Sequence, residues 1–261
     1  QDIENPLSAE IQIPESFTTI TVPQSGIDFI NLPNMLINFK DVSISYGEKK
    51  ILNSINWTVN KGDFWQLSGT NGSGKSTILS MIFGDNPKAY GQNIHLFGSK
   101  KGSGESVWDI KKKIGYYAPA MTDKFSGRHS IENMLISGLN DSVGLYVKPT
   151  AFQQRIIKQW LALLDLSDIK NTFFNALSTG KQRLVMTARA MVKQPPLLIL
   201  DEPTAGMDDD SAALLVALVN KFAEETDTAI IFVSHRKEKG LKPKQTFYLT
   251  PHETGSTGSI K

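Results

Sequence analysis

The sequence contains no cysteine, which excludes disulfide bonds, cysteine-ligated zinc sites and thiol catalysis. It also lacks a long apolar run, because the longest purely apolar stretch, 212–219, has eight residues, whereas a membrane-spanning helix needs about 20. Any membrane role therefore needs a partner. The excess of positive charge is small, with 28 Lys and Arg against 26 Asp and Glu, so total charge does not indicate a nucleic-acid partner. With 261 residues, 40% of them hydrophobic, the chain has the composition of a globular protein.

The first 39 residues contain no Lys or Arg but five acidic residues, so residues 40–261 hold 28 basic and 21 acidic residues, a charge of +7. Prolines at positions 6, 14, 23 and 33 predict an extended segment. The chain starts at Gln1 rather than Met, and we expect a piece of a longer protein. Residues 1–35 are then a Pro-rich acidic arm, either a linker from a preceding domain or a segment that lies along the surface. Residues 251–261 are polar and Gly-rich, which predicts a flexible tail.

Short apolar runs bounded by turn residues predict strands that are buried on both faces of a parallel sheet: 64–67, 197–200 and 230–233. Apolar residues at helical spacing predict helices at 154–164, 181–192 and 213–222. Alternating strands and helices indicate right-handed βαβ units and an α/β fold, in which ligands bind at the carboxyl ends of the strands.

A glycine-rich segment, Gly69–Thr77, follows the first of these strands and fits the pattern G-x-x-x-x-G-K-[ST]. Its glycines permit the backbone to point several N–H groups at phosphate oxygens, and the helix that begins near Lys75 adds its positive end. Lys75 can reach the β and γ phosphates, and the Ser76 hydroxyl can ligate Mg²⁺. The predicted nucleotide-binding residues here are Gly69, Asn71, Gly72, Ser73, Gly74, Lys75, Ser76 and Thr77. The motif alone does not separate kinases, GTPases, helicases and transport ATPases.

Two further strands end in polar side chains. Asp201 and Glu202 follow the apolar run 197–200, which suits Asp201 for Mg²⁺ and Glu202 for polarising an attacking water. His235 follows 230–233 and could hydrogen-bond the γ-phosphate or the water, although a lone histidine at a strand end is often incidental. Ser178 precedes a predicted helix and by itself indicates only an N-cap.

Five ordered segments, GTNGSGKST, LSTGKQR, LLILDEP, TAGMD and SHR, resemble those of an ABC-type ATPase, the nucleotide-binding domain of ABC proteins. The resemblance implies a P-loop NTPase core with a small antiparallel β lobe at about 36–63 and an inserted, mostly helical lobe at about 121–176, within a domain that spans 36–250. It also implies the following roles: Tyr46 stacks on adenine, Gly69–Thr77 is the Walker A loop, Ser178 and Gly180 belong to the signature, Asp201 and Glu202 are the Walker B aspartate and the catalytic glutamate, Asp208 is the D-loop aspartate, and His235 is the switch histidine.

Two features depart from the family pattern. The signature reads LSTGK where LSGGQ is common, so Thr179 adds a β-branched side chain where the backbone should approach phosphate. The segment 114–120, IGYYAPA, stands where the family usually carries the Q-loop glutamine, and it has none. Segments 102–120, 135–146 and 158–166 resemble the ModF/PhrA group, which is connected with molybdenum transport and photorepair, lacks the same glutamine and often carries two ABC domains in one chain. We expect the second domain of such a tandem.

The resemblance implies that ATP and Mg²⁺ are the cofactors and that two ABC domains arrange head to tail, each signature closing over ATP held by the other Walker A loop. Our main hypothesis is an ATPase that couples energy to a molybdate-like transporter through a membrane permease, in the cytoplasm or peripheral at the inner face of the membrane. The alternative is a non-transport ABC ATPase that acts on another macromolecule, which the missing glutamine favours. A nucleotide sensor without turnover is disfavoured by Glu202 and His235, and a kinase or GTPase explains neither LSTGK nor Tyr46.

Overall fold

The computed structural model describes residues 13–29, 31–125, 128–145 and 147–261. Its centre is a six-stranded sheet in the order β10-β9-β3-β8-β7-β6. Strands β6, β7, β8, β3 and β9 are parallel, and β10 pairs antiparallel with β9 at one edge. The strands are β3 (Phe64–Gly69), β6 (Ile114–Tyr117), β7 (Leu197–Asp201), β8 (Ala229–Ser234), β9 (Gln245–Thr250) and β10 (Thr257–Ile260). The predicted α/β core is confirmed.

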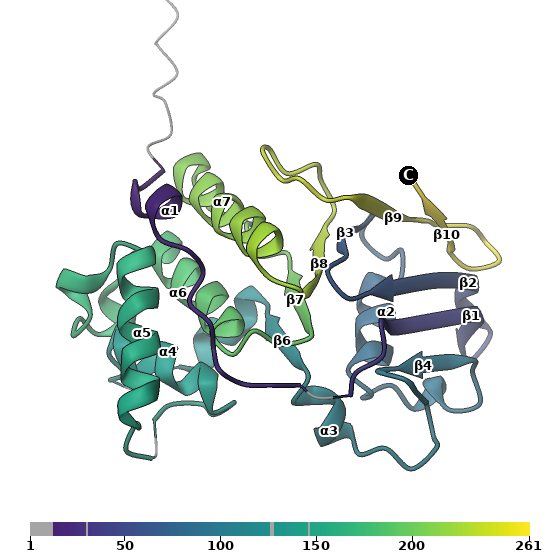
Figure 1. Ribbon diagram of the computed structural model, residues 1–261. Coiled ribbons are helices and arrows are strands. Elements are labelled where there is room, and N and C mark those ends of the chain that lie inside the picture. Colours follow the sequence, from purple (N-terminus) through teal and green to yellow (C-terminus); the bar gives the residue numbers. More distant parts are fainter. Residues whose placement is uncertain (1–12, 30, 126–127, 146) are drawn as a thin grey trace, which may run out of the picture.

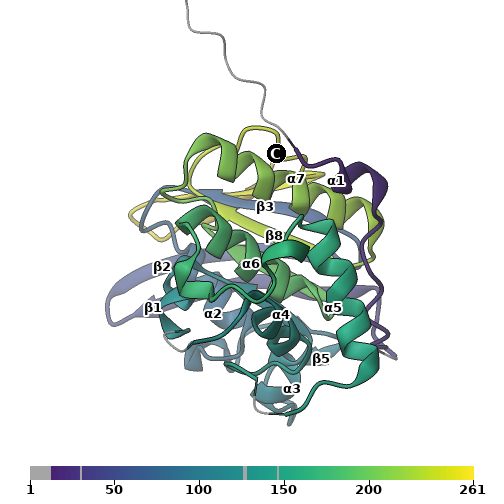
Figure 2. The same cartoon turned by 90° about the vertical axis from the view of Figure 1, so that its left-hand side faces the viewer.

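Both faces of this sheet are covered, which explains its unbroken apolar strands. On β7, Leu198 and Leu200 belong to one hydrophobic cluster, whereas Leu197 and Ile199 belong to another on the opposite face. The first cluster contains residues of α4 (Ile131–Leu139), α5 (Ala151–Leu163), α6 (Thr179–Met191) and α7 (Asp209–Glu225). The second includes α2 (Lys75–Ile82) and a separate antiparallel sheet. Figure 2 shows the helical layer in front of β3 and β8, with β1 and β2 behind.

The separate sheet has the order β2-β1-β4-β5, made of β1 (Met35–Tyr46), β2 (Lys49–Asn60), β4 (Ile94–Leu96) and β5 (Ser99–Lys100). It contains the antiparallel β lobe expected near 36–63. The lobe also includes residues beyond that range, because β4 pairs with β1 through Phe39 and Ile94. A short helix, α3 (Val107–Lys111), leads from this lobe to β6.

Helices α4 and α5 lie within the expected helical insertion at 121–176. Each begins at a hydroxyl side chain that accepts a hydrogen bond from the helix backbone, Ser130 for α4 and Thr150 for α5, where Gln153 completes a capping box. Trp160 of α5 is fully buried, as the apolar stripe predicts. Among the described residues, no helix is long and apolar enough to cross a membrane.

Residues 13–29 of the N-terminal arm lie across the molecule as an extended segment, apart from the single helical turn α1 (Ser16–Thr19) that the prolines did not predict (Figure 1). The Ser16 hydroxyl donates to the carbonyl of Leu163 at the end of α5, at 2.8 Å. The amide of Val22 donates to the Glu225 carboxylate at the end of α7, at 2.7 Å. The arm therefore connects the inserted helical layer with a helix that follows the core strand β7.

Phe17 is 7% exposed and belongs to the helical cluster, so it carries much of the arm's attachment. Replacing it with Ala is expected to cost about 3 kcal/mol of unfolding free energy and to lower Tm by roughly 5–10 °C. Thermal unfolding followed by circular dichroism measures this. The matched control is Ile13→Ala in the same arm, because Ile13 is 48% exposed and its truncation should leave Tm almost unchanged. Equal Tm values for the two variants would show that the burial of Phe17 does not contribute to stability.

The prediction of a flexible tail at 251–261 is wrong for its second half. Residues 257–260 form β10 on β9, with Ser259 opposite Tyr248. The preceding Ser256 exchanges backbone hydrogen bonds with Ile51 and Asn53 of β2, at 2.9 and 2.8 Å. The small residues that suggested disorder are instead required because the chain passes close to other strands. A Cβ at Gly258 would lie 2.2 Å from the ring of Phe247.

Candidate functional site

The loop between β3 and α2 has the backbone geometry of a phosphate cradle. Gly69 ends β3 at φ 153°, and a Cβ there would lie 2.6 Å from Ser73 Oγ and 2.8 Å from the Leu249 carbonyl oxygen. Gly74 precedes α2 at φ 96°, and a Cβ there would lie 2.6 Å from a methyl carbon of Leu52. Side chains at these positions would force the loop to open. The exposed residues Asn71 and Gly72 form its tip, and Ser76 and Thr77 lie in the first turn of α2.

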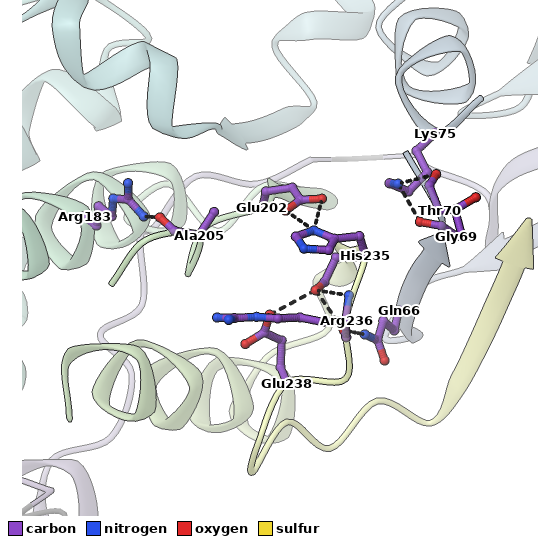
Figure 3. Close-up of polar contacts among 11 residues, drawn as sticks. Gln66, Gly69, Thr70, Lys75, Arg183, Glu202, Ala205, His235, Arg236 and Glu238 are labelled. Carbon is purple, nitrogen blue, oxygen red and sulfur yellow. Dashed lines mark hydrogen bonds and ion pairs between the residues drawn. The ribbon is translucent and has the colours of Figure 1, made fainter. Parts of the chain in front are cut away.

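Two polar side chains of this loop have contacts that a bound anion would change. The Lys75 ammonium donates to the carbonyls of Gly69 and Thr70, at 2.7 and 3.2 Å, so it bends back over its own loop (Figure 3). The Ser73 hydroxyl is fully buried and, within the described part of the chain, its Oγ has no hydrogen-bond partner. An unpaired buried hydroxyl is costly, and the loop therefore carries both a cation and an unpaired donor.

Tyr46 lies at the end of β1 with 47% of its surface exposed. Its hydroxyl accepts a hydrogen bond from the Asn86 side-chain amide at 2.9 Å. Asn86 is 4% exposed and also donates to Ser80 of α2 at 3.0 Å. The Tyr46 ring is thus exposed, but its hydroxyl is held by the buried amide of Asn86. Asn86 is in turn bonded to α2, the helix that begins at the phosphate loop.

Asp201 ends β7 and is close enough to the phosphate loop for Lys75 to act on it. Burial raises the pKa of the Asp201 carboxyl, and the neighbouring Glu202 charge raises it further, while the Tyr116 hydroxyl and the Lys75 charge lower it. The Tyr116 oxygen lies 3.4 Å from Asp201 Oδ2. Burial first, and then the Asp201 charge, raise the pKa of Tyr116 to about 12, so its hydroxyl stays a donor near neutral pH.

Glu202 and His235 face each other, as Figure 3 shows. His235 Nδ1 lies 2.7 Å from Oε2 and 2.9 Å from Oε1 of Glu202. Glu202 adopts φ 52°, in the left-handed region, and its amide donates to the Val233 carbonyl at 3.0 Å. An ionised carboxylate can only accept, so the proton of this pair is on Nδ1 and Nε2 remains available for another contact. The strained backbone at Glu202 is typical of a functional position.

Ser178, Gly180 and Asp208 form a second group at the starts of α6 and α7. Ser178 caps α6 by accepting the Lys181 N–H at 3.4 Å, and Asp208 caps α7 by accepting the Ser211 N–H at 2.8 Å. Hydrogen bonds from Ser211 lower the pKa of Asp208. A Cβ at Gly180 would lie 2.2 Å from Ser211 Oγ, so glycine allows the two helix starts to meet. Among the described residues, no hydrogen bond or ion pair joins this second group to Gly69–Thr77.

Two residues contribute to these groups although the motif pattern gave them no role. Tyr116 lies in β6, in the segment that lacks the family glutamine, and its hydroxyl donates a hydrogen bond to Asp201. Arg183 of α6 donates to the carbonyls of Ala205 and, at 3.5 Å, Pro203, and so ties α6 to the segment after Glu202 (Figure 3). Arg183 lies inside the quoted LSTGKQR segment, but only the tertiary structure shows which carbonyls it reaches.

The donor set fits Mg²⁺. Ser76 and Asp201 offer a hydroxyl and a carboxylate, the hard oxygen ligands that this ion prefers. Among the described residues, no group of three or more His, Asp or Glu could hold a metal ion. A site with so few protein ligands suits an ion that keeps several waters and takes its remaining ligands from substrate phosphates.

Comparison with known proteins identifies the family of this chain. A family model described as ABC transporter matches residues 52–205, more than half of the chain. The chain therefore belongs to the ABC transporter family, and it is an ABC-type ATPase domain.

Its relatives include the ABC transporter ATP-binding protein ModF of Escherichia coli, 41% identical over 209 residues that cover 80% of this chain and 42% of ModF. An uncharacterized ABC transporter ATP-binding protein of Schizosaccharomyces pombe is 33% identical over 80% of this chain and 43% of its own length. The chain thus spans less than half the length of these two relatives. The similarity to ModF agrees with the group that the sequence resembles.

Solved structures show the same fold. The cbiO1 protein of Clostridium perfringens, part of the ABC transporter complex cbiONQ, matches with a TM-score of 0.71 at 21% identity, over 86% of this chain and 87% of its own. A dimeric post-hydrolysis state of the ATP-binding cassette MJ0796, bound to ADP and Pi, matches with a TM-score of 0.68 at 21% identity, over 87% of this chain and 98% of its own. The predicted fold class is confirmed.

Proposed function

We propose that this domain hydrolyses Mg-ATP at a composite site formed head to tail with a second ABC domain, and that it supplies energy for transport. The observation that carries the proposal is the separation of the two groups. Charge and contact link Lys75, Asp201, Glu202 and His235 to one another. Among the residues that the structure describes, the group of Ser178 at the start of α6 has no bond to the phosphate loop. A second domain would bring its own signature group to this loop.

In the proposed reaction, Lys75 exchanges its two carbonyl partners for the β and γ phosphates, and the N–H groups of Gly69–Thr77 bind the same phosphates. Glu202 takes a proton from the attacking water. His235 is oriented by Glu202 through Nδ1, and its Nε2 accepts from the attacking water when the ring is neutral or donates to the γ-phosphate when the ring is an imidazolium. Ser76 and Asp201 would hold Mg²⁺, and the bound ion would supply positive charge to the phosphate site.

Tyr46 is proposed to stack on the adenine base. Its removal in Tyr46→Ala is expected to weaken ATP binding by about 5- to 100-fold, because base–aromatic stacking contributes about 1–3 kcal/mol. Calorimetric titration with ATP in the Glu202→Gln background measures the Kd without turnover. Tyr46→Phe keeps the ring, loses only the hydrogen bond from Asn86, and should stay within about threefold of the parent. Equal Kd values for Tyr46→Ala and the parent would remove Tyr46 from the site.

Transport is favoured over action on another macromolecule, because the family model and both named relatives carry an ABC transporter description. A molybdate-like substrate, a membrane permease as partner and a place at the inner face of the membrane belong to the same proposal through the similarity to ModF. The test is purification of the full-length protein from membranes. Co-purification with a multi-span membrane protein supports transport, whereas stimulation of ATPase activity by nucleic acid or ribosomes without membrane association supports the alternative.

A further inference from the structure

A buried carboxylate lies directly behind His235. Glu238 belongs to a basic segment, with Arg236, Lys237 and Lys239, whose sequence is typical of a solvated surface. Its neighbours are exposed, but Glu238 itself is only 7% exposed. Burial of a carboxylate is unfavourable unless partners compensate for the lost water, so its contacts show what it does there.

The contacts of Glu238 are with the two residues that flank His235. The hydroxyl of Ser234, which is 1% exposed, lies 2.9 Å from Glu238 Oε1, and Arg236 Nε donates to the same oxygen at 3.1 Å. The Ser234 hydroxyl has a single proton, which it shares between Glu238 and the Arg236 carbonyl at 2.8 Å. The Arg236 amide in turn donates to Ser234 Oγ at 3.2 Å. The Glu238 carboxylate thus contacts both residues that flank His235 and fixes the turn formed by residues 234–238.

The same turn is fastened to the strand that leads into the phosphate loop. Gln66 lies in β3, is 8% exposed, and its side-chain amide donates to the Arg236 carbonyl at 3.0 Å. Figure 3 shows Gln66 and Glu238 reaching Arg236 from opposite sides, with His235 directed away from them toward Glu202. Three residues after Gln66 the chain reaches Gly69, so the position of the turn is set relative to the loop that holds Lys75.

We propose that Glu238 and Gln66 are positioning residues that hold turn 234–238 so that His235 faces Glu202. Neither residue contacts Glu202, and neither is placed at the nucleotide. Their effect is on geometry, since without the carboxylate the Ser234 hydroxyl and the Arg236 guanidinium lose their common acceptor and the turn gains other conformations. The inference deepens the proposed function, because it rests on the role of His235 in hydrolysis.

The experiment is steady-state hydrolysis of Mg-ATP by the chain and its variants, with KM and kcat measured separately. Glu238→Ala is expected to lower kcat by about 10- to 100-fold, because small misplacements of a catalytic group have effects of this size, and to change the KM for ATP less than about threefold. Glu238→Gln keeps one acceptor oxygen and should retain much more of kcat. Lys237→Ala, an exposed residue of the same turn, is the matched control and should leave kcat unchanged.

A double-mutant cycle separates positioning from a general structural role. In the His235→Ala background, Glu238→Ala is expected to cause no further loss of kcat, because there is no imidazole left to position. If Glu238→Ala fails to fold, Gln66→Leu, which removes one hydrogen bond and keeps the volume, takes its place in the cycle. Additive losses, or wild-type kcat in Glu238→Ala, would overturn the inference. If instead His235→Ala itself leaves kcat unchanged, the proposed role of His235 fails, which is a distinguishable result.

Discussion

Glu202→Gln is expected to lower the rate of ATP hydrolysis by about 10²–10⁴-fold while ATP still binds. The amide has almost the same shape as the carboxylate but cannot take a proton from water, and it can still contact His235, which lies 2.7 Å from Oε2. Because ATP then persists in the site, we expect a nucleotide-dependent dimer that is detectable by light scattering at constant protein concentration. Phosphate release measures the loss of turnover in the same samples.

Glu224→Gln is the matched control for Glu202→Gln, since Glu224 is exposed on α7 and, among the described residues, its carboxylate makes only a 3.9 Å ion pair with Lys242. It changes the charge by the same amount and should hydrolyse ATP at the parent rate. Undiminished hydrolysis in Glu202→Gln would assign the general base to another group. A monomer under every nucleotide condition would contradict the composite-site model for this chain.

Lys75→Ala is expected to weaken ATP binding by roughly 10- to 100-fold, because a hydrogen bond from a charged donor contributes about 1.5–3 kcal/mol. The variant should also fail to dimerise with ATP when it is combined with Glu202→Gln. Equilibrium titration with ATP, followed by light scattering of the double variant, measures both effects.

Lys148→Ala removes the same charge from an exposed position and should bind ATP like the parent. If Lys75→Ala also bound ATP like the parent, the loop 69–77 would not be the phosphate site. If it bound weakly but still dimerised with ATP, dimerisation would not depend on the nucleotide held by this loop. The two readouts therefore test binding and assembly separately.

The phosphate loop was predictable because its chemistry is local. It depends on the backbone angles of Gly69 and Gly74 and on the helix that begins at Lys75, all of which are set by adjacent residues. The structure has the positive φ values that the glycines predict. Asp201 and His235 were also identifiable, since parallel strands with buried faces bring their carboxyl ends to one edge. The contact between Glu202 and His235 then follows from the pairing of β7 with β8.

Other features were missed because they depend on segments that are far apart in the sequence. Glu238 has the sequence context of a solvated surface, yet it is buried because Ser234 and Arg236 surround its carboxylate. The composition of the tail 251–261 indicated flexibility, but residues 257–260 pair with the edge of β9. The Pro-rich arm was expected to be extended, but nothing in it specified the single helical turn around Phe17, which the helical layer stabilises.

The sequence by itself determined the class of this protein, an α/β ATPase domain of the ABC transporter family, because ordered motifs and apolar runs reflect local backbone geometry and burial. Only the tertiary structure decided how His235 is held, which face residues 13–29 of the arm cover, and that, within the described part of the chain, the group of Ser178 is separate from the phosphate loop. These are long-range contacts, and their free energy depends on side chains from different elements meeting at hydrogen-bond distance, which no local pattern encodes.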